Sequence, residues 1–159
     1  MAIDFLALKN ECINNPNNYS DPTTGLTLTQ AWVGGFDQVC VNILNRVRNS
    51  ITIGRSDVAP SEVIEAIAIN QFVSNVPVIH ASWFESFSQL PAVRLVSVDA
   101  NGVSTDSQVM KNLMLLLANQ SASENRLRAL ATRKGSRTEQ LFGEGTVLVP
   151  DHIITARSA

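Results

Sequence analysis

Charged side chains are scarce in this chain of 159 residues: they make up 16% of it, and the formal net charge is −2. Soluble domains usually carry about a quarter of charged residues. Because a monomer normally keeps a well-charged surface, the shortage favours a protein that neighbours largely cover. Hydrophobic residues account for 45% of the chain, which supports a packed core and excludes a disordered chain.

Long hydrophobic runs are also absent. The longest one, residues 113–118, is far shorter than the roughly 20 residues that a membrane span needs. The chain starts Met-Ala-Ile-Asp4, with neither a basic segment nor an apolar one behind it, so no secretory signal is expected. We therefore expect cytosolic synthesis and no membrane partner.

Metal-binding motifs are missing because the two histidines, His80 and His152, have no Cys, Asp or Glu in helical register. His80 lies beside Trp83 and Phe84, which favours a packed, hydrogen-bonded histidine. His152 follows Pro150 and is most simply a residue in the first turn of a helix, with a protein–protein contact as the alternative. We expect no metal and no cofactor.

Catalytic motifs are missing as well. There is no Gly-x-Ser-x-Gly sequence, and neither Cys12 nor Cys40 has a positioned base. Both cysteines lie in apolar helical contexts, which favours buried thiols; a disulfide between them is the alternative. Scattered acids such as Glu62 and Glu85 read as surface residues. The sequence therefore predicts a protein that is not an enzyme.

What the chain does have is helical periodicity over most of its length. Apolar spacing and capping signals predict helices over residues 2–13, 27–49, 60–77, 80–89, 109–117 and 121–133. Short extended pieces are expected at 51–53 and 93–98, and a cap for the following helix at 104–108. The Gly34–Gly35 pair weakens the longest of these helices, as a fray, a kink or a close helix crossing.

The last 25 residues differ from this helical body. Ser136 and Glu139 have the spacing of a capping box, Gly143 is a stop signal, and residues 147–149 are extended. Their apolar side chains are too few to form a core, so the segment must dock elsewhere. We expect residues 1–134 to fold as a helical body and residues 135–159 to dock as an extended C-terminal arm on a partner. Docking on the body of the same chain is the alternative.

A basic cluster lies just before and within this arm. It comprises Arg126, Arg128, Arg133, Lys134 and Arg137, with no acid between Glu124 and Glu139. Such a stripe is able to follow a nucleic-acid backbone. Complementing a helix C-terminus is the stronger interpretation, and an acidic groove on a partner subunit is a third.

The order of these signals resembles a known group of proteins. A Leu6-x-x-Lys9-x-Glu11 helix precedes an Asn-Asn-Pro loop with Tyr19, and a middle block spans Val58 to Ile67. The tail reads Gly-Ser136-Arg-Thr-Glu-Gln-Leu-Phe-Gly-Glu-Gly-Thr-Val-Leu-Val, then His152-Ile-Ile-Thr-Ala-Arg. This resembles small tailed-bacteriophage virion morphogenesis proteins, which end in Ser-Arg-Ala-Glu-x-Leu-(Phe/Gly)-Gly-x-Gly-Thr; Thr138 replaces the alanine.

The resemblance implies a structural protein of the virion, in the head-to-tail neck as adaptor or connector, or in the tail. With the helical pattern, it leads us to expect a mainly α, single helical domain with a minor strand, acting through ring assembly with copies of itself and neighbouring virion proteins. The expected subunit interface comprises Ser136, Arg137, Glu139, Leu141, Phe142, Val147, Leu148, Val149, His152 and Ile153. The alternative is a DNA-binding or packaging accessory that uses the 126–137 stripe.

Overall fold

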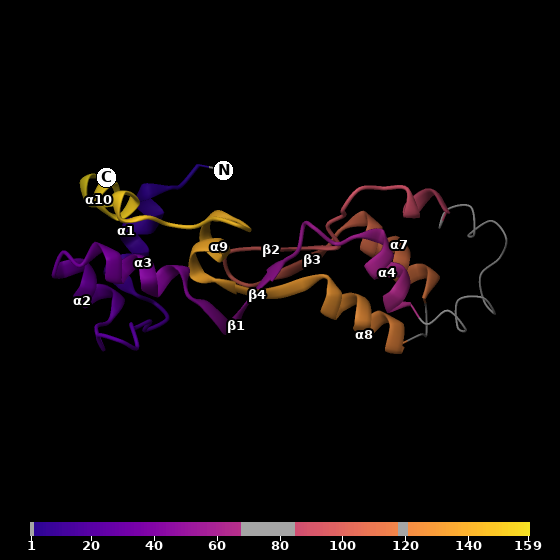
Figure 1. Cartoon of the computed structure of the whole chain (residues 1–159), viewed down its shortest axis with the longest axis horizontal. Helices are drawn as coiled ribbons and strands as arrows, with labels where there is room; N and C mark the ends of the chain where they lie inside the picture. Colours follow the sequence, from indigo (N-terminus) through magenta and orange to yellow (C-terminus); the bar gives the residue numbers. More distant parts are fainter. Residues whose placement is uncertain (1, 68–84, 118–120) are drawn as a thin grey trace. The chain divides into compact units, whose positions relative to one another are not determined.

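The computed structural model of the chain describes residues 2–67, 85–117 and 121–159. These residues form two compact units (Figure 1). Unit 1 comprises residues 1–51 and 134–159, and unit 2 comprises residues 52–133. Helix predominates, with two small sheets, so the fold is mixed α/β with a helical majority.

Unit 1 begins with α1 (Phe5–Asn14), close to the helix predicted over residues 2–13. The side chain of Asp4 caps its start by accepting a hydrogen bond of 2.9 Å from the backbone N–H of Ala7. Asn15 ends it in a left-handed conformation, with φ 38°. The loop that follows, with the Asn-Asn-Pro sequence, runs to the bridge between Ser20 and Thr27.

The long helix predicted over residues 27–49 is wrong. The structure has α2 (Leu28–Val33) and α3 (Asp37–Asn45) instead. Gly35 adopts φ +73°, which a helix interior does not allow, so the break falls at the glycine pair. From Arg46 the backbone is extended and leads into β1 (Val47–Gly54), which is longer than the strand expected at 51–53.

The C-terminal segment packs on the N-terminal one. After β4 (Thr132–Ser136), α9 (Arg137–Phe142) and α10 (Pro150–Ser158) follow. Helix α10 contacts α1 and α3 in unit 1, as Figure 1 shows by the yellow and indigo ribbons. The core of unit 1 comprises Leu8, Cys12, Leu28, Ala31, Trp32, Cys40, Val41, Ile43, Leu44, Phe142, Leu148, Ile153 and Ala156.

This packing alters the expected domain division. One division between the units falls between residues 133 and 134, next to the boundary predicted between residues 134 and 135, and residues 134–159 lie with residues 1–51 in unit 1. Leu148 and Ile153, which were expected to dock on a partner, are buried in the core of their own unit. In the structure, the C-terminal segment therefore docks on the body of its own chain, which was the alternative to docking on a partner.

Unit 2 has its own core. Its elements are α4 (Pro60–Ala66), β2 (Val96–Val98), β3 (Ser104–Asp106), α7 (Gln108–Leu116) and α8 (Ser121–Leu130). The core comprises Val58, Val63, Ile67, Phe87, Leu95, Val96, Met110, Leu113, Leu117, Leu127 and Ala131. The central position predicted for the 109–117 helix is confirmed for Leu113 and Leu117, which are buried.

Two details of unit 2 differ from the predictions. Residues 104–106, expected to cap a helix, pair with β2 as an antiparallel hairpin, and Ser107 is the cap of α7. The last predicted helix ends at Leu130 rather than 133, since β4 begins at Thr132. Strands β1 and β4 pair with each other, and the chain passes between the units within them.

Some predictions fall outside the described residues. They concern the second half of the 60–77 helix, including Ala68, Phe72 and Pro77, and the start of the 80–89 helix, including His80, Trp83 and Phe84. Residues 85–88 of that second segment are helical, and Phe87 is buried.

Candidate functional site

The ten residues predicted for a subunit interface separate into two groups. At the start of α9, Ser136 and Glu139 form the expected capping box, and the Glu139 carboxylate also accepts from the N–H of Gly145 at 3.0 Å. Phe142, Leu148 and Ile153 are buried, and Leu141, Arg137 and His152 are partly buried. The two that remain exposed are Val147 and Val149, which are 65% and 45% accessible.

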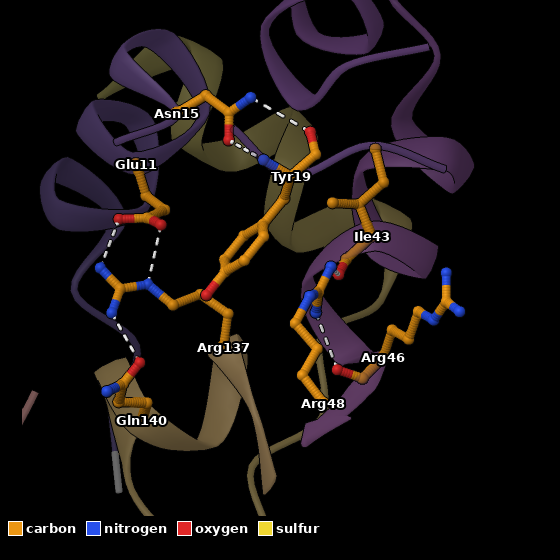
Figure 2. A network of polar contacts seen from close by, with 8 residues as sticks. All are labelled: Glu11, Asn15, Tyr19, Ile43, Arg46, Arg48, Arg137 and Gln140. Carbon is orange, nitrogen blue, oxygen red and sulfur yellow. Dashed lines mark hydrogen bonds and ion pairs between the residues drawn. The ribbon is translucent and has the colours of Figure 1, made fainter. Parts of the chain in front are cut away.

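An ion pair inside unit 1 accounts for the partly buried position of Arg137. The Nε and Nη2 atoms of Arg137 donate to the two carboxylate oxygens of Glu11 at 2.7 and 2.8 Å (Figure 2). Gln140 accepts a third bond from this guanidinium at 2.7 Å. The Glu11 hydrogen bond raises the pKa of Arg137. This bidentate pair holds α9 against α1.

Sequence reasoning missed this pair, although a signal was present. Glu11 falls on the same face of α1 as Leu8 and Cys12, at the three-four spacing of buried residues. A carboxylate at such a position requires a cation or several donors. The position of that cation, 126 residues further along the chain, is set by tertiary packing alone.

Tyr19 lies between two arginines, as Figure 2 shows. Its backbone is fixed by Asn15, whose side chain accepts from the Tyr19 N–H at 2.8 Å and donates to the Tyr19 carbonyl at 3.1 Å. The guanidinium of Arg48 stacks on the Tyr19 ring, 4.0 Å from its centre. On the other side of the ring is the side chain of Arg137.

Arg48 also binds the end of α3. Its two terminal nitrogens donate to the carbonyl oxygens of Arg46 at 2.8 Å and Ile43 at 2.6 Å. These bonds satisfy carbonyls that a helix C-terminus leaves without partners. Burial lowers the pKa of Arg48. Among the residues that the structure describes, no carboxylate forms an ion pair with Arg46 or Arg48.

These residues border a surface hollow of about 390 Å³. Its lining comprises Asn18, Tyr19, Ser20, Arg46, Val47, Arg48 and Asn49. We call it the Arg48 hollow. Two arginines, two amides and two hydroxyl groups line it, and no acid does. This set of donors suits an oxyanion.

A second hollow, of about 510 Å³, lies elsewhere in unit 1. Its lining comprises Ile3, Phe5, Glu144, Gly145, Thr146, Val147 and His152. The rings of Phe5 and His152 are 6.2 Å apart, so the first turns of α1 and α10 lie side by side. The exposed carboxylates of Asp4 and Asp151 belong to these two helix starts.

The predicted basic stripe is not one open cationic surface. Arg137 is taken up by Glu11, and Arg128 forms an ion pair with Asp106 at 3.2 Å. Lys134 donates to the carbonyl oxygen of Asn49 at 2.7 Å. Arg126 remains exposed on α8. The stripe therefore offers a nucleic-acid backbone fewer cations than its sequence suggested.

The cysteines are buried free thiols, as predicted, with no disulfide between them. The hydrogen bond with Cys40, reinforced by burial, raises the pKa of the Cys12 thiol. No cluster of His, Cys, Asp or Glu suited to a metal ion occurs within residues 2–67, 85–117 and 121–159. In the same ranges no helix has the length and apolar character to cross a membrane.

Comparisons of the chain with protein-family models, with curated proteins and with solved structures gave no match.

Proposed function

We propose that this chain is a structural component of a tailed-phage virion, in the head-to-tail neck or the tail, and that it acts by assembling into a ring with copies of itself. On this proposal it is made in the host cytoplasm and has no catalytic role. Its partners are further copies and neighbouring virion proteins. The resemblance of the 135–157 segment to phage morphogenesis proteins motivates the proposal.

The observation that carries it is an apolar surface on unit 1. Leu6 and Ile13 lie on the exposed stripe of α1, seven residues apart. The hydroxyl of Thr29 donates to the carbonyl of Ile13 at 3.2 Å, which brings α2 beside the end of that stripe. Val33, one helical turn beyond Thr29, is 79% exposed. Large apolar side chains grouped in this way are typical of interaction surfaces.

The scarcity of charge supports the same conclusion. Only 16% of the chain is charged, so few surface charges oppose the approach of a second copy. Exposed apolar residues in unit 1 also include Phe36, Val47, Val147, Val149 and Ile154. A surface of this composition suits the partly covered subunit of an assembly more than a free monomer.

The experiment that tests the proposal locates the chain in intact particles. Virions of the phage that encodes it are purified, their proteins are identified by mass spectrometry, and the density of the particle is searched for a ring of this chain. We expect stoichiometric incorporation at the neck or along the tail. Absence from purified virions would overturn the proposal. Binding to DNA that weakens steeply with salt, without incorporation, would favour the packaging accessory instead.

A further inference from the structure

We infer that the Arg48 hollow receives an acidic segment of a second copy of this chain, namely the helix starts that carry Asp4 and Asp151. We call these two residues, with the exposed Val147 and Val149 that precede Asp151, the acidic edge. The inference rests on the proposed ring assembly, because it names the two surfaces that would join neighbouring copies.

The charge of the hollow calls for a carboxylate. Arg46 is exposed and Arg48 half-buried, and neither forms an ion pair with a carboxylate in the described parts of the chain. Burial lowers the pKa of Arg48, and the charge of Arg46 lowers it further, while Tyr19 acts in the opposite direction. The nearest acid along the loop, Asp21, accepts two hydrogen bonds of 2.8 Å from Thr24; these bonds lower its pKa, and the charge of Arg46 contributes to the same shift without forming an ion pair. An incoming carboxylate would relieve the repulsion.

The hollow is also arranged before any partner arrives. Arg48 is held by the carbonyls of Ile43 and Arg46 and by the ring of Tyr19, as Figure 2 shows. A guanidinium has five N–H donors, and two of the nitrogens of Arg48 bind these carbonyls. Because the side chain is already ordered, docking would cost little conformational entropy there.

The acidic edge complements the hollow in charge and in apolar character. Asp4 and Asp151 are exposed, and the contact between Phe5 and His152 brings their helix starts together. One carboxylate oxygen of Asp4 accepts the capping hydrogen bond from Ala7 at 2.9 Å, which leaves its second oxygen for a partner. Val47, at the rim of the hollow, is 60% exposed next to Arg46. Each surface therefore places a charge beside an exposed valine, so that docking would pair opposite charges and bury apolar area together.

The two surfaces lie at different edges of unit 1. In Figure 1, α10 lies at the upper edge of unit 1, and α2 and the start of β1 lie at the lower edge. One copy therefore does not satisfy its own hollow. A contact between two unlike surfaces is heterologous, and its repetition closes into a ring when the rotation allows it.

A protein carboxylate fits the hollow better than a nucleic-acid backbone does. A duplex or single strand presents many phosphates, and its binding proteins match them with a series of cations. Here two arginines line the hollow and Lys134 donates to the carbonyl oxygen of Asn49 in its lining, while the chain is acidic overall. Arg128 and Arg137 are paired with Asp106 and Glu11. The two carboxylates of the acidic edge match this limited positive charge.

The test is a charge swap measured by sedimentation velocity on the full chain. We expect wild-type protein to self-associate, and Arg46→Glu or Asp151→Lys alone to weaken the association about tenfold or more, since like charges would then face each other. An equimolar mixture of the two single variants should associate again, in alternation. The double variant Arg46→Glu/Asp151→Lys should self-associate without a second variant.

Arg126→Glu is the matched control, because it reverses an exposed arginine outside both surfaces; it should associate like the wild type. Circular dichroism checks that every variant is folded. The inference is overturned if Arg46→Glu associates like the wild type, or if neither the mixture nor the double variant regains association. In either case, incorporation into virions can still support the proposed function. A wild-type chain that stays monomeric at high concentration also overturns it. If Arg46→Glu instead abolishes binding to a single-stranded oligonucleotide and leaves association intact, the ligand is nucleic acid.

Discussion

Unit 1 joins the two ends of the chain, whereas unit 2 is one continuous segment, residues 52–133. Five polar residues are buried in unit 1, namely Glu11, Asn15, Asp21, Ser136 and Thr138. In the described part of unit 2 the buried polar residue is Ser123. Asn15, Asp21 and Ser136 have partners three or four residues away, whereas Glu11 and Thr138 bind Arg137 and Asn45, which lie far away in sequence. The described part of the second unit has fewer buried polar residues and a core of apolar side chains.

Asn45 shows how unit 1 uses such partners. Its amide oxygen accepts from the hydroxyl of Thr138 at 2.8 Å and from the N–H of Leu148 at 3.0 Å, and its amide nitrogen donates to the Leu148 carbonyl at 2.9 Å. One residue at the end of α3 thus fixes two points of the C-terminal segment. Partners of this kind specify how the ends of the chain are placed, because buried polar groups are costly without them.

Arg157 makes a further contact that fixes the C-terminal segment near the end of the chain. Its guanidinium donates to the Asp37 carboxylate at 2.9 and 3.0 Å and stacks over the Trp32 ring, 4.3 Å from the ring centre. The ion pairs of unit 2, such as Arg55 with Glu62 and Arg128 with Asp106, join residues that lie closer in sequence or are more exposed to solvent. The comparison teaches that unit 1 is the part whose folding requires the complete chain.

The largest effect is expected from deleting residues 137–159. Phe142, Leu148, Ile153 and Ala156 would leave the core of unit 1, and Glu11 would lose its cation. We expect α1 and α3 to lose their protection from hydrogen exchange while α4, α7 and α8 keep theirs, measured by exchange with mass spectrometry. Full protection of α1 and α3 in the truncated chain would show that the segment is a dispensable arm after all.

Arg137→Ala should destabilise unit 1 by about 3–5 kcal/mol, because it leaves the Glu11 carboxylate buried without its partner. Urea unfolding followed by hydrogen exchange at the amides of α1 and α3 measures the loss. The double variant Glu11→Leu/Arg137→Met is the control, since replacing both charges by apolar groups avoids the unpaired carboxylate. Equal instability of the single and double variants would contradict this account of the pair.

Leu113→Ala should destabilise unit 2 by about 2–5 kcal/mol through the cavity that it leaves, since Leu113 is fully buried in α7. Leu115→Ala, two residues further along the same helix and exposed, is the matched control, with an expected change within about 0.5 kcal/mol. Thermal melts with residue-level hydrogen exchange assign the loss to its unit. If both variants melt alike, the central position of α7 in the core is wrong.

The smallest effect is expected from Arg128→Ala. The pair with Asp106 is exposed on the arginine side, so its loss should cost about 0.2–1 kcal/mol and even less at high salt. Chemical unfolding at two salt concentrations measures it. A cost as large as that of Arg137→Ala would remove the contrast between the two units.

The local signals in the sequence were reliable where they concern a few neighbouring residues. The capping box of Ser136 and Glu139, the helix start at Pro60 and the loop after Asn14 are all present. Each of these depends on hydrogen bonds or dihedral restrictions within about four residues, which the sequence displays directly. The same holds for the burial of Leu113 and Leu117, which follows from helical periodicity.

The predictions that were wrong depended on competition between neighbours in space. Residues 46–49 continue a helical apolar pattern, yet they are extended because the strand β1 pairs with β4, far along the chain. Gly54 shows the same dependence: a Cβ there would lie 2.3 Å from the Val96 carbonyl oxygen, so this close approach admits glycine alone. The residues around position 54 carry no sequence signal that predicts this contact.

By itself the sequence determined where helices such as α4 and α9 start, although it predicted helix over residues 47–49 and 132–133, which are strand. It also predicted that the last 25 residues cannot form a core alone. The tertiary structure decided where those residues dock: on α1 and α3 of the same chain, through Leu148, Ile153 and the pair of Arg137 with Glu11. The physical reason is that capping and periodicity act over a few residues. Burial of an apolar surface and neutralisation of a buried charge require only a partner in space, whatever its position in the chain.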